Sequence, residues 1–184
     1  AVPDDARTCW GRCRGALIQG DDMAFHHLAL ATNDMDATHR FYTEAMGFEL
    51  AKAVVGPTPE GGWAKHVFYR TEGDDGALIA FWDLHGDYDV ATGGMSGAVG
   101  LPDWVNHLAF RAVDDAHFDA CLKRWLDLGL DVFEIDHEFC RSIYTNDPTG
   151  TLVEWCLDTR PLDEAEEIVK LDKEIAEINK LKEQ

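Results

Sequence analysis

Two stretches of the chain share one order of apolar and polar positions, which indicates an internal repeat. Residues 26–50 (HHLALATNDMDATHRFYTEAMGFEL) and 106–132 (NHLAFRAVDDAHFDACLKRWLDLGLDV) each begin with a strand pattern around His-Leu-Ala. An amphipathic helix pattern follows, opened by an N-cap aspartate (Asp34, Asp114) and closed by a glycine (Gly47, Gly129). Further on, GALIAF (76–81) matches GTLVEW (150–155), so Ala80 stands where the second copy has Glu154.

Each copy therefore reads as a strand, a helix and three more strands. In the first copy we expect strands near 24–31, 48–55, 64–70 and 77–83, with a helix near 34–46. In the second we expect strands near 105–112, 131–135, 141–145 and 151–156, with a helix near 114–128. Two such modules side by side predict an α+β fold, with a curved mixed sheet and the helices outside it.

The same pattern divides the chain into five segments. They are an N-terminal extension (1–22), a first βαβββ module (23–90), a Gly-rich linker (91–104), a second βαβββ module (105–158) and a C-terminal amphipathic helix (159–184). The extension precedes Met23 and is expected to be disordered or non-native. The last segment has an apolar stripe at near-heptad spacing, formed by Ile168, Leu171, Ile175, Ile178 and Leu181. We expect this helix to lie on the body or on a partner subunit.

Charge and composition narrow the classes of function. With 35 acidic and 16 basic residues the formal net charge is −19, which argues against a nucleic-acid partner. No apolar run is long enough for a membrane span, and the N-terminus has no signal-peptide core, so the expected location is cytoplasmic. The five cysteines are scattered and odd in number, and we expect buried thiols rather than a disulfide framework.

Three polar residues on the predicted strands could hold a metal ion. His27 and His107 occupy matched positions in the two copies, and Glu154 lies on the last strand of the second copy. Two imidazoles and one carboxylate suit a divalent transition metal, above all Fe(II), with Mn(II), Zn(II) or Ni(II) as alternatives. The other interpretation of each histidine is a hydrogen-bonded core residue.

The stretch around Glu154 resembles a known superfamily signature. Tyr144-x-x-Asp147-Pro148-x-Gly150-x-x-x-Glu154, together with the repeat, resembles the vicinal oxygen chelate superfamily of glyoxalases, bleomycin resistance proteins and extradiol dioxygenases. The resemblance covers residues 24–157. It implies paired βαβββ modules around a metal cleft, with the metal on His27, His107 and Glu154.

Within that superfamily the chain is most similar to the type I extradiol ring-cleavage dioxygenases. Glyoxalases have a fourth ligand where this chain has Ala80, and fosfomycin transferases have a threonine where it has Ala29. The pattern from Ile135-x-His137 through Tyr144 to Glu154 satisfies the dioxygenase motif. The resemblance implies that His137 and Tyr144 are catalytic and hydrogen-bond the substrate oxygens.

One residue of the dioxygenase pattern is missing. The proton-shuttling histidine of those enzymes falls at about Ala77 here, with His66 or His85 as alternatives. The resemblance implies Fe(II)-dependent cleavage of a catechol-like aromatic by O₂. A redox-neutral lyase, isomerase or glutathione/thiol transferase, or a non-catalytic aromatic-binding protein, are the alternatives.

We expect an apolar, aromatic substrate pocket. Its candidate residues are Trp63, Phe68, Phe81, Trp82 and Trp104. A homodimer is expected as well. The modules would pair within one chain or swap across the dimer, and in the swapped form His27 comes from the other subunit.

Overall fold

The computed structural model describes residues 25–71, 76–90, 93–161 and 163–182. The first module contains β1 (His27–Thr32), α1 (Met35–Arg40), its π-helical continuation η2 (Phe41–Ala45), β2 (Glu49–Pro57), β3 (Trp63–Arg70) and β4 (Leu78–His85). The second contains β5 (His107–Arg111), α3 (Asp115–Asp127), β6 (Phe133–Asp136), β7 (Cys140–Asn146) and β8 (Leu152–Asp158). The short helix α2 (Gly94–Gly97) and the long helix α4 (Glu164–Lys182) complete the fold. Both predicted βαβββ repeats are therefore present, and the predicted extension 1–22 lies outside the described residues.

The two modules have the same topology. Their sheets have strand orders β1-β4-β3-β2 and β5-β8-β7-β6, each with one parallel pair and two antiparallel pairs. The strand register repeats as well, because Ala29 pairs with Ala80 as Ala109 pairs with Glu154. This match confirms the sequence alignment of the two copies.

The helix boundaries follow from local capping. The Asp34 side chain accepts a hydrogen bond from the Ala37 amide at 2.9 Å, and Asp114 accepts one from the His117 amide at 2.8 Å. Such caps satisfy backbone donors that have no partner inside the helix. Past the helix ends, Gly47 and Gly129 have φ of 75° and 72°, a left-handed conformation that favours glycine.

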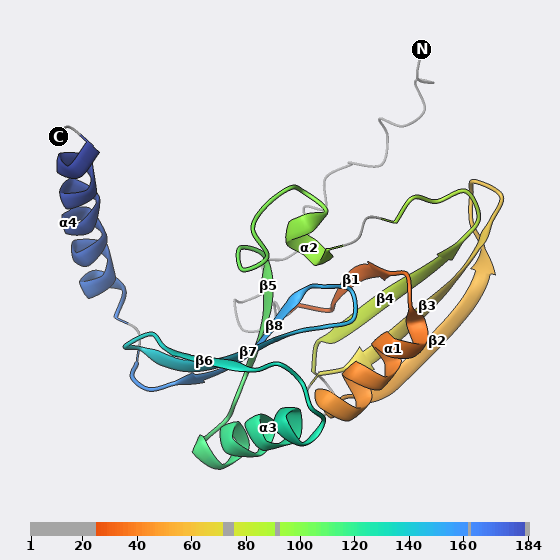
Figure 1. Cartoon of the computed structure of the whole chain (residues 1–184), viewed down its shortest axis with the longest axis horizontal. Coiled ribbons are helices and arrows are strands. Elements are labelled where there is room, and N and C mark those ends of the chain that lie inside the picture. Colours follow the sequence, from red (N-terminus) through yellow and green to blue (C-terminus); the bar gives the residue numbers. More distant parts are fainter. Residues whose placement is uncertain (1–24, 72–75, 91–92, 162, 183–184) are drawn as a thin grey trace, which may run out of the picture.

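The modules meet through their helices and share one core (Figure 1). Phe48, just after η2, packs edge-on against Phe110 and Trp155 of the second module, at ring distances of 5.0 and 6.2 Å. On α3, the indole of Trp125 donates to the Ala45 carbonyl at 3.1 Å. Because alternate strand residues point to opposite faces, each sheet has a helix face in this core and an opposite face turned away from it.

The Asp-Pro turn of the signature motif has a structural role between the modules. One Asp147 oxygen accepts from the backbone amides of Thr149 and Thr151 at 2.8 and 3.0 Å, which closes the β7–β8 turn. The other oxygen accepts from the Tyr42 hydroxyl of the first module at 2.9 Å. A single buried carboxylate therefore shapes the turn and joins it to η2.

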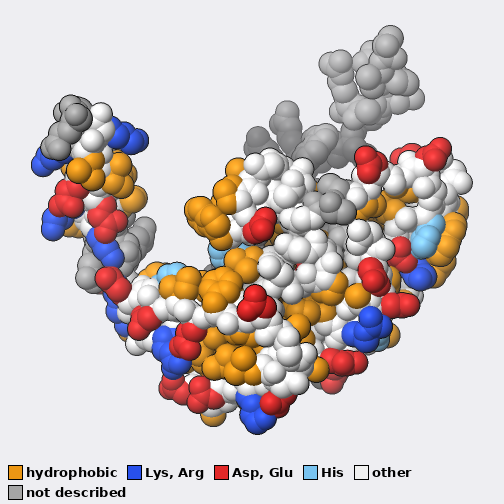
Figure 2. All heavy atoms as spheres, in the orientation of Figure 1, with side chains coloured by type: hydrophobic (Ala, Val, Ile, Leu, Met, Phe, Trp, Pro, Cys, Tyr) orange, Lys and Arg blue, Asp and Glu red, His pale blue; other side chains and the backbone are white. Residues whose placement is uncertain are grey.

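Helix α4 does not lie on the body, so that part of the expectation was wrong. It projects away from the rest of the chain (Figure 1), and the apolar side chains described on it, from Val169 to Leu181, are exposed (Figure 2). Ile175 and Ile178 are 46% and 52% exposed. Lys170 forms an ion pair with Glu138 at 3.2 Å, near the base of the helix. No helix in the described part of the chain is both long and apolar enough to cross a membrane.

Candidate functional site

His107 and Glu154 form a polar pair on the second sheet. His107 begins the edge strand β5, and Glu154 lies on the neighbouring strand β8, with both side chains on the face away from the core. The His107 Nε2 and a Glu154 carboxylate oxygen are 3.2 Å apart. Two protein atoms that bind one transition metal at about 2.1 Å each, at right angles, lie about 3 Å apart. The pair therefore fits two positions of a metal site.

Tyr144 and His137 extend this pair into a cluster of four. Tyr144 is the direct cross-strand neighbour of Glu154, and its hydroxyl lies 2.9 Å from the His137 Nε2. The Tyr144 and His107 rings are 6.4 Å apart. Burial, with a smaller contribution from the Glu154 charge, raises the pKa of Tyr144 to about 12. The phenol thus keeps its proton at neutral pH and can donate a hydrogen bond.

The third predicted ligand, His27, lies on the other sheet. Its ring neighbours are His26, with the two Nδ1 atoms 2.7 Å apart, and His66 and Phe68, with centroids 6.4 and 5.6 Å away. The described residues contain no group of three or more His, Cys, Asp or Glu that could hold a metal ion. Within one chain the structure therefore brings together two of the three predicted ligands and leaves His27 apart.

The first module cannot form an equivalent pair of its own. Its counterpart of Glu154 is Ala80, a fully buried methyl group next to Ala29. The first sheet therefore offers imidazoles near His27 but no carboxylate at the position that matches Glu154.

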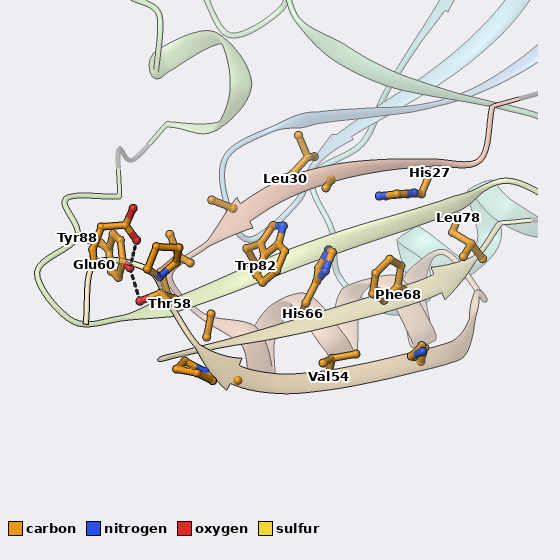
Figure 3. Close-up of a pocket in the computed structure, with 18 of the residues that line it drawn as sticks. His27, Leu30, Val54, Thr58, Glu60, His66, Phe68, Leu78, Trp82 and Tyr88 are labelled. Carbon is orange, nitrogen blue, oxygen red and sulfur yellow. Dashed lines mark hydrogen bonds between the residues drawn. The ribbon is translucent and has the colours of Figure 1, made fainter. Parts of the chain in front are cut away.

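A cavity of about 1080 Å³ covers the open face of the first sheet (Figure 3). His27 lies at one end of it, and Phe68, His66 and Trp82 lie along its floor. At the other end the Tyr88 hydroxyl bonds to Thr58 and, at 2.9 Å, to the Glu60 carboxylate. Because these three come from the β2–β3 turn and the segment after β4, they close that end of the cavity.

Two of the five predicted pocket residues line this cavity, and three do not. Phe68 and Trp82 line it. Phe81 is a correction, because it is fully buried in the core on the opposite face of β4 from Trp82. Trp63 stacks on His85 at 3.8 Å outside the cavity, and Trp104 is 70% exposed on the loop before β5.

The structure separates the two alternative proton-shuttle residues. His85 is bound to Asp83 at 3.0 Å and does not line the cavity. His66 lines it beside His27, and burial, together with His27, lowers the pKa of its imidazole, so it is uncharged at neutral pH. Its place on the cavity floor follows from strand alternation with Phe68, a signal present in the sequence. Lys52 also lines the cavity, and no sequence signal pointed to it.

The fold and the family model agree on the class of protein. Residues 24–155 match the model of the Glyoxalase/Bleomycin resistance protein/Dioxygenase superfamily, and the chain belongs to that family. The superfamily contains lyases, dioxygenases and transferases. No curated protein matches the chain.

Solved structures share the fold at low sequence identity. A glyoxalase/bleomycin resistance protein/dioxygenase domain from Frankia sp. has a TM-score of 0.58 and 19% identity, over 74% of this chain and 98% of that one. Lactoylglutathione lyase from Agrobacterium tumefaciens has a TM-score of 0.51 and 23% sequence identity, over 73% of this chain and 92% of that one. A point mutant of the fosfomycin resistance protein FosX from Listeria monocytogenes was solved with Mn(II) and dihydroxypropylphosphonic acid. It has a TM-score of 0.52 and 21% sequence identity, over 76% of this chain and 94% of that one.

Proposed function

We propose that the chain is a metal-dependent enzyme of this superfamily that cleaves a catechol-like aromatic with O₂, in the manner of an extradiol dioxygenase. The observation that carries the proposal is the continuous contact from His107 through Glu154 and Tyr144 to His137. It combines two ligands with a protonated phenol and an imidazole that can exchange a proton with it. Cavity residues Phe68 and Trp82 supply the apolar surroundings that an aromatic substrate needs.

The roles of the polar side chains follow from their positions. His107 and Glu154 would hold the metal, which suits Fe(II) and would relay electrons between the substrate and O₂. The Tyr144 phenol donates a hydrogen bond to a substrate oxygen as negative charge develops on it. When a substrate hydroxyl loses its proton, the Tyr144 oxygen can accept it while the Tyr144 proton passes to His137 Nε2, 2.9 Å away.

The third ligand would come from a second copy of the chain. β1 and β5 are the edge strands of their sheets, and in the described structure neither has a partner strand on its outer side. The exposed imidazoles of His27 and His107 each stand at the start of one of these edges. A symmetric dimer that sets β1 of one copy beside β5 of the other would bring His27 to the His107–Glu154 pair. The cavity of one copy would then open onto the cluster of the other.

Oxygen uptake tests the activity. The protein is loaded anaerobically with Fe(II) and mixed with a panel of single-ring and fused-ring catechols, with His107→Ala as the inactive variant and His117→Ala as a matched control outside the cluster. Substrate-dependent uptake in the wild type and in His117→Ala, lost in His107→Ala, supports a dioxygenase. Absence of uptake in iron-loaded protein across the panel overturns it.

A second function has one observation in its favour. A single chain combines a large apolar cavity with only two ligands in the described cluster, which suits a protein that binds an aromatic compound without converting it. Metal stoichiometry separates the two proposals. About one tightly bound metal ion per chain, lost in Glu154→Gln, favours the enzyme, and metal-independent ligand binding favours the binding protein.

A further inference from the structure

The strand register arranges the cavity floor in two rows. Across β2, β3, β4 and β1, one row contains Lys52, Phe68, Ala80 and Ala29, and the next contains Val54, His66, Trp82 and Ala31. The aromatic side chains therefore stand together in the middle of the floor, with small residues on the β1 side. Ala29 and Ala31 line the cavity on that side, whereas Ala80 is fully buried beneath its neighbours.

The central side chains form an aromatic shelf in which the rings stand side by side, so that it presents mainly ring edges to the cavity. The His66 and Trp82 rings are nearly parallel, with centroids 3.6 Å apart and planes 14° apart, and Phe68 lies 4.1 Å from His66 (Figure 3). Trp82 is 38% exposed, so part of its ring faces the cavity. A planar ligand ring can lie across these ring edges in edge-to-face contact without displacing a core residue.

The size of the cavity sets the scale of the ligand. Pockets of about 300–1,000 Å³ hold drug-sized ligands. At about 1080 Å³ the cavity would leave most of its volume to water around a single-ring catechol. That volume matches several fused rings instead.

The charge of the cavity differs from that of the chain. The chain has a formal net charge of −19, yet the cavity lining contains one carboxylate, Glu60, which Tyr88 binds at 2.9 Å at the far end. Lys52 lies beside Phe68 in its row, and no carboxylate of the described residues forms an ion pair with it. The Lys52 end of the shelf thus favours an anionic group.

We propose that the cavity binds an extended, planar, multi-ring aromatic compound with an anionic substituent. Its fused rings lie across the ring edges of His66, Trp82 and Phe68, and its anion lies at Lys52. This inference deepens the proposed function, since it names the substrate class of the same site. A ring oxygen at the His27 end would then reach the metal ligands.

The test measures binding to metal-free full-length protein by isothermal titration calorimetry. Anthraquinone-2-sulfonate supplies three fused rings and one anion, and benzenesulfonate supplies the same anion on one ring. We expect the three-ring probe to bind at least tenfold more tightly. Trp82→Ala should weaken its binding about tenfold and Lys52→Gln about fivefold, whereas Trp63→Ala, an exposed tryptophan outside the cavity, should leave it unchanged.

Trp82→Phe separates ring contact with the ligand from folding, because it keeps a ring on the shelf and should restore most of the affinity. Equal affinity for the two probes, or equal losses in Trp82→Ala and Trp63→Ala, overturns the inference. Because the protein contains no metal in this assay, the result is independent of the oxygen-uptake test. Binding of the three-ring probe without any oxygen uptake counts against the dioxygenase alone, and uptake with single-ring catechols but no three-ring binding counts against the ligand class alone.

Discussion

Tyr42 and Asp147, one from each module, are hydrogen bonded at 2.9 Å inside the shared core. Tyr42 is fully buried and Asp147 is 4% exposed. Because Asp147 also closes the β7–β8 turn, this contact fixes the turn before β8, the strand that presents Glu154, relative to the first module. The signature aspartate is thus part of the framework that positions the site rather than of the site itself.

Removing the Tyr42 hydroxyl should destabilise the fold. Tyr42→Phe leaves one oxygen of a buried carboxyl group without this partner, which costs about 1–3 kcal/mol. Urea unfolding followed by circular dichroism measures the loss. Tyr88→Phe is the control, because its bonds to Glu60 and Thr58 are exposed and part-buried and should cost about 1 kcal/mol or less. Equal losses of unfolding free energy in both variants would mean that the Tyr42–Asp147 bond stabilises the fold no more than the bonds of Tyr88 do.

The pH dependence of stability should reveal the Asp147 carboxyl. Burial raises its pKa above the ordinary value, so the folded protein holds this proton more tightly than the unfolded chain does. The resulting stabilisation is complete below the ordinary carboxyl pKa of about 3.9 and is lost as the pH rises through the folded-state pKa. The free energy of unfolding of the wild type, minus that of Asp147→Asn, should therefore fall as the pH rises through this range. Urea titrations at several pH values measure it, and a difference that grows with pH would show that hydrogen bonds to the carboxylate outweigh its burial.

Tyr144→Phe should separate catalysis from metal binding. If the phenol stabilises developing charge, its loss lowers kcat about 100-fold. Metal content should stay the same, because His107 and Glu154 remain in place. Steady-state oxygen uptake and metal analysis of the same preparation measure both quantities. Loss of metal in step with activity would instead make Tyr144 a structural support of Glu154.

The exposed stripe on α4 should contribute little to the stability of an isolated chain. Ile175→Ala and Ile178→Ala should change the free energy of unfolding by less than about 0.5 kcal/mol, since both side chains are exposed. The buried Ile143 offers the contrast, and Ile143→Ala should cost about 2–5 kcal/mol. Urea unfolding at two protein concentrations measures these values. A concentration-dependent loss above about 1 kcal/mol in the α4 variants would show that a second copy covers the stripe.

The sequence predicted most of the order within each module and little of the order between modules. Matching His27 with His107 and Ala80 with Glu154 anticipated the strand register, because both copies keep the same spacing between caps and strands. The packing of α3 on the η2 turn rests on contacts such as Trp125 to Ala45, between residues far apart in the chain. A repeat contains no information about such contacts.

The same contrast between order within one module and order between modules applies to the candidate site. Strand alternation and the signature motif placed His107, Glu154, Tyr144 and His137 together, since the first three lie on strands of one sheet and His137 lies in its β6–β7 turn. Alternation also distinguishes Trp82 from Phe81, which point to opposite faces of β4, although aromatic character alone does not. The sequence could not fix the position of His27 relative to the cluster, because that depends on how two sheets associate.

Mixing two inactive variants tests whether His27 acts across a dimer. His27→Ala lacks the first ligand and His107→Ala lacks the second, so each variant alone should bind metal weakly and show no activity. In a dimer with shared sites, one chain of each kind restores one complete site, with His27 from the His107→Ala chain and His107 from the His27→Ala chain. Random exchange makes half of the dimers mixed, and each restores one of its two sites, so about one quarter of the wild-type activity should return.

The control mixes His107→Ala with Glu154→Ala. Both lesions lie in the second module, so every site in any mixed dimer lacks one ligand and no activity should return. Unfolding and refolding the mixtures together ensures exchange, and size-exclusion chromatography with light scattering gives the oligomeric state. If the first mixture remains as inactive as the control while both form dimers, His27 does not complete a site with His107 and Glu154 of another copy, and the cluster on the second sheet must function without it.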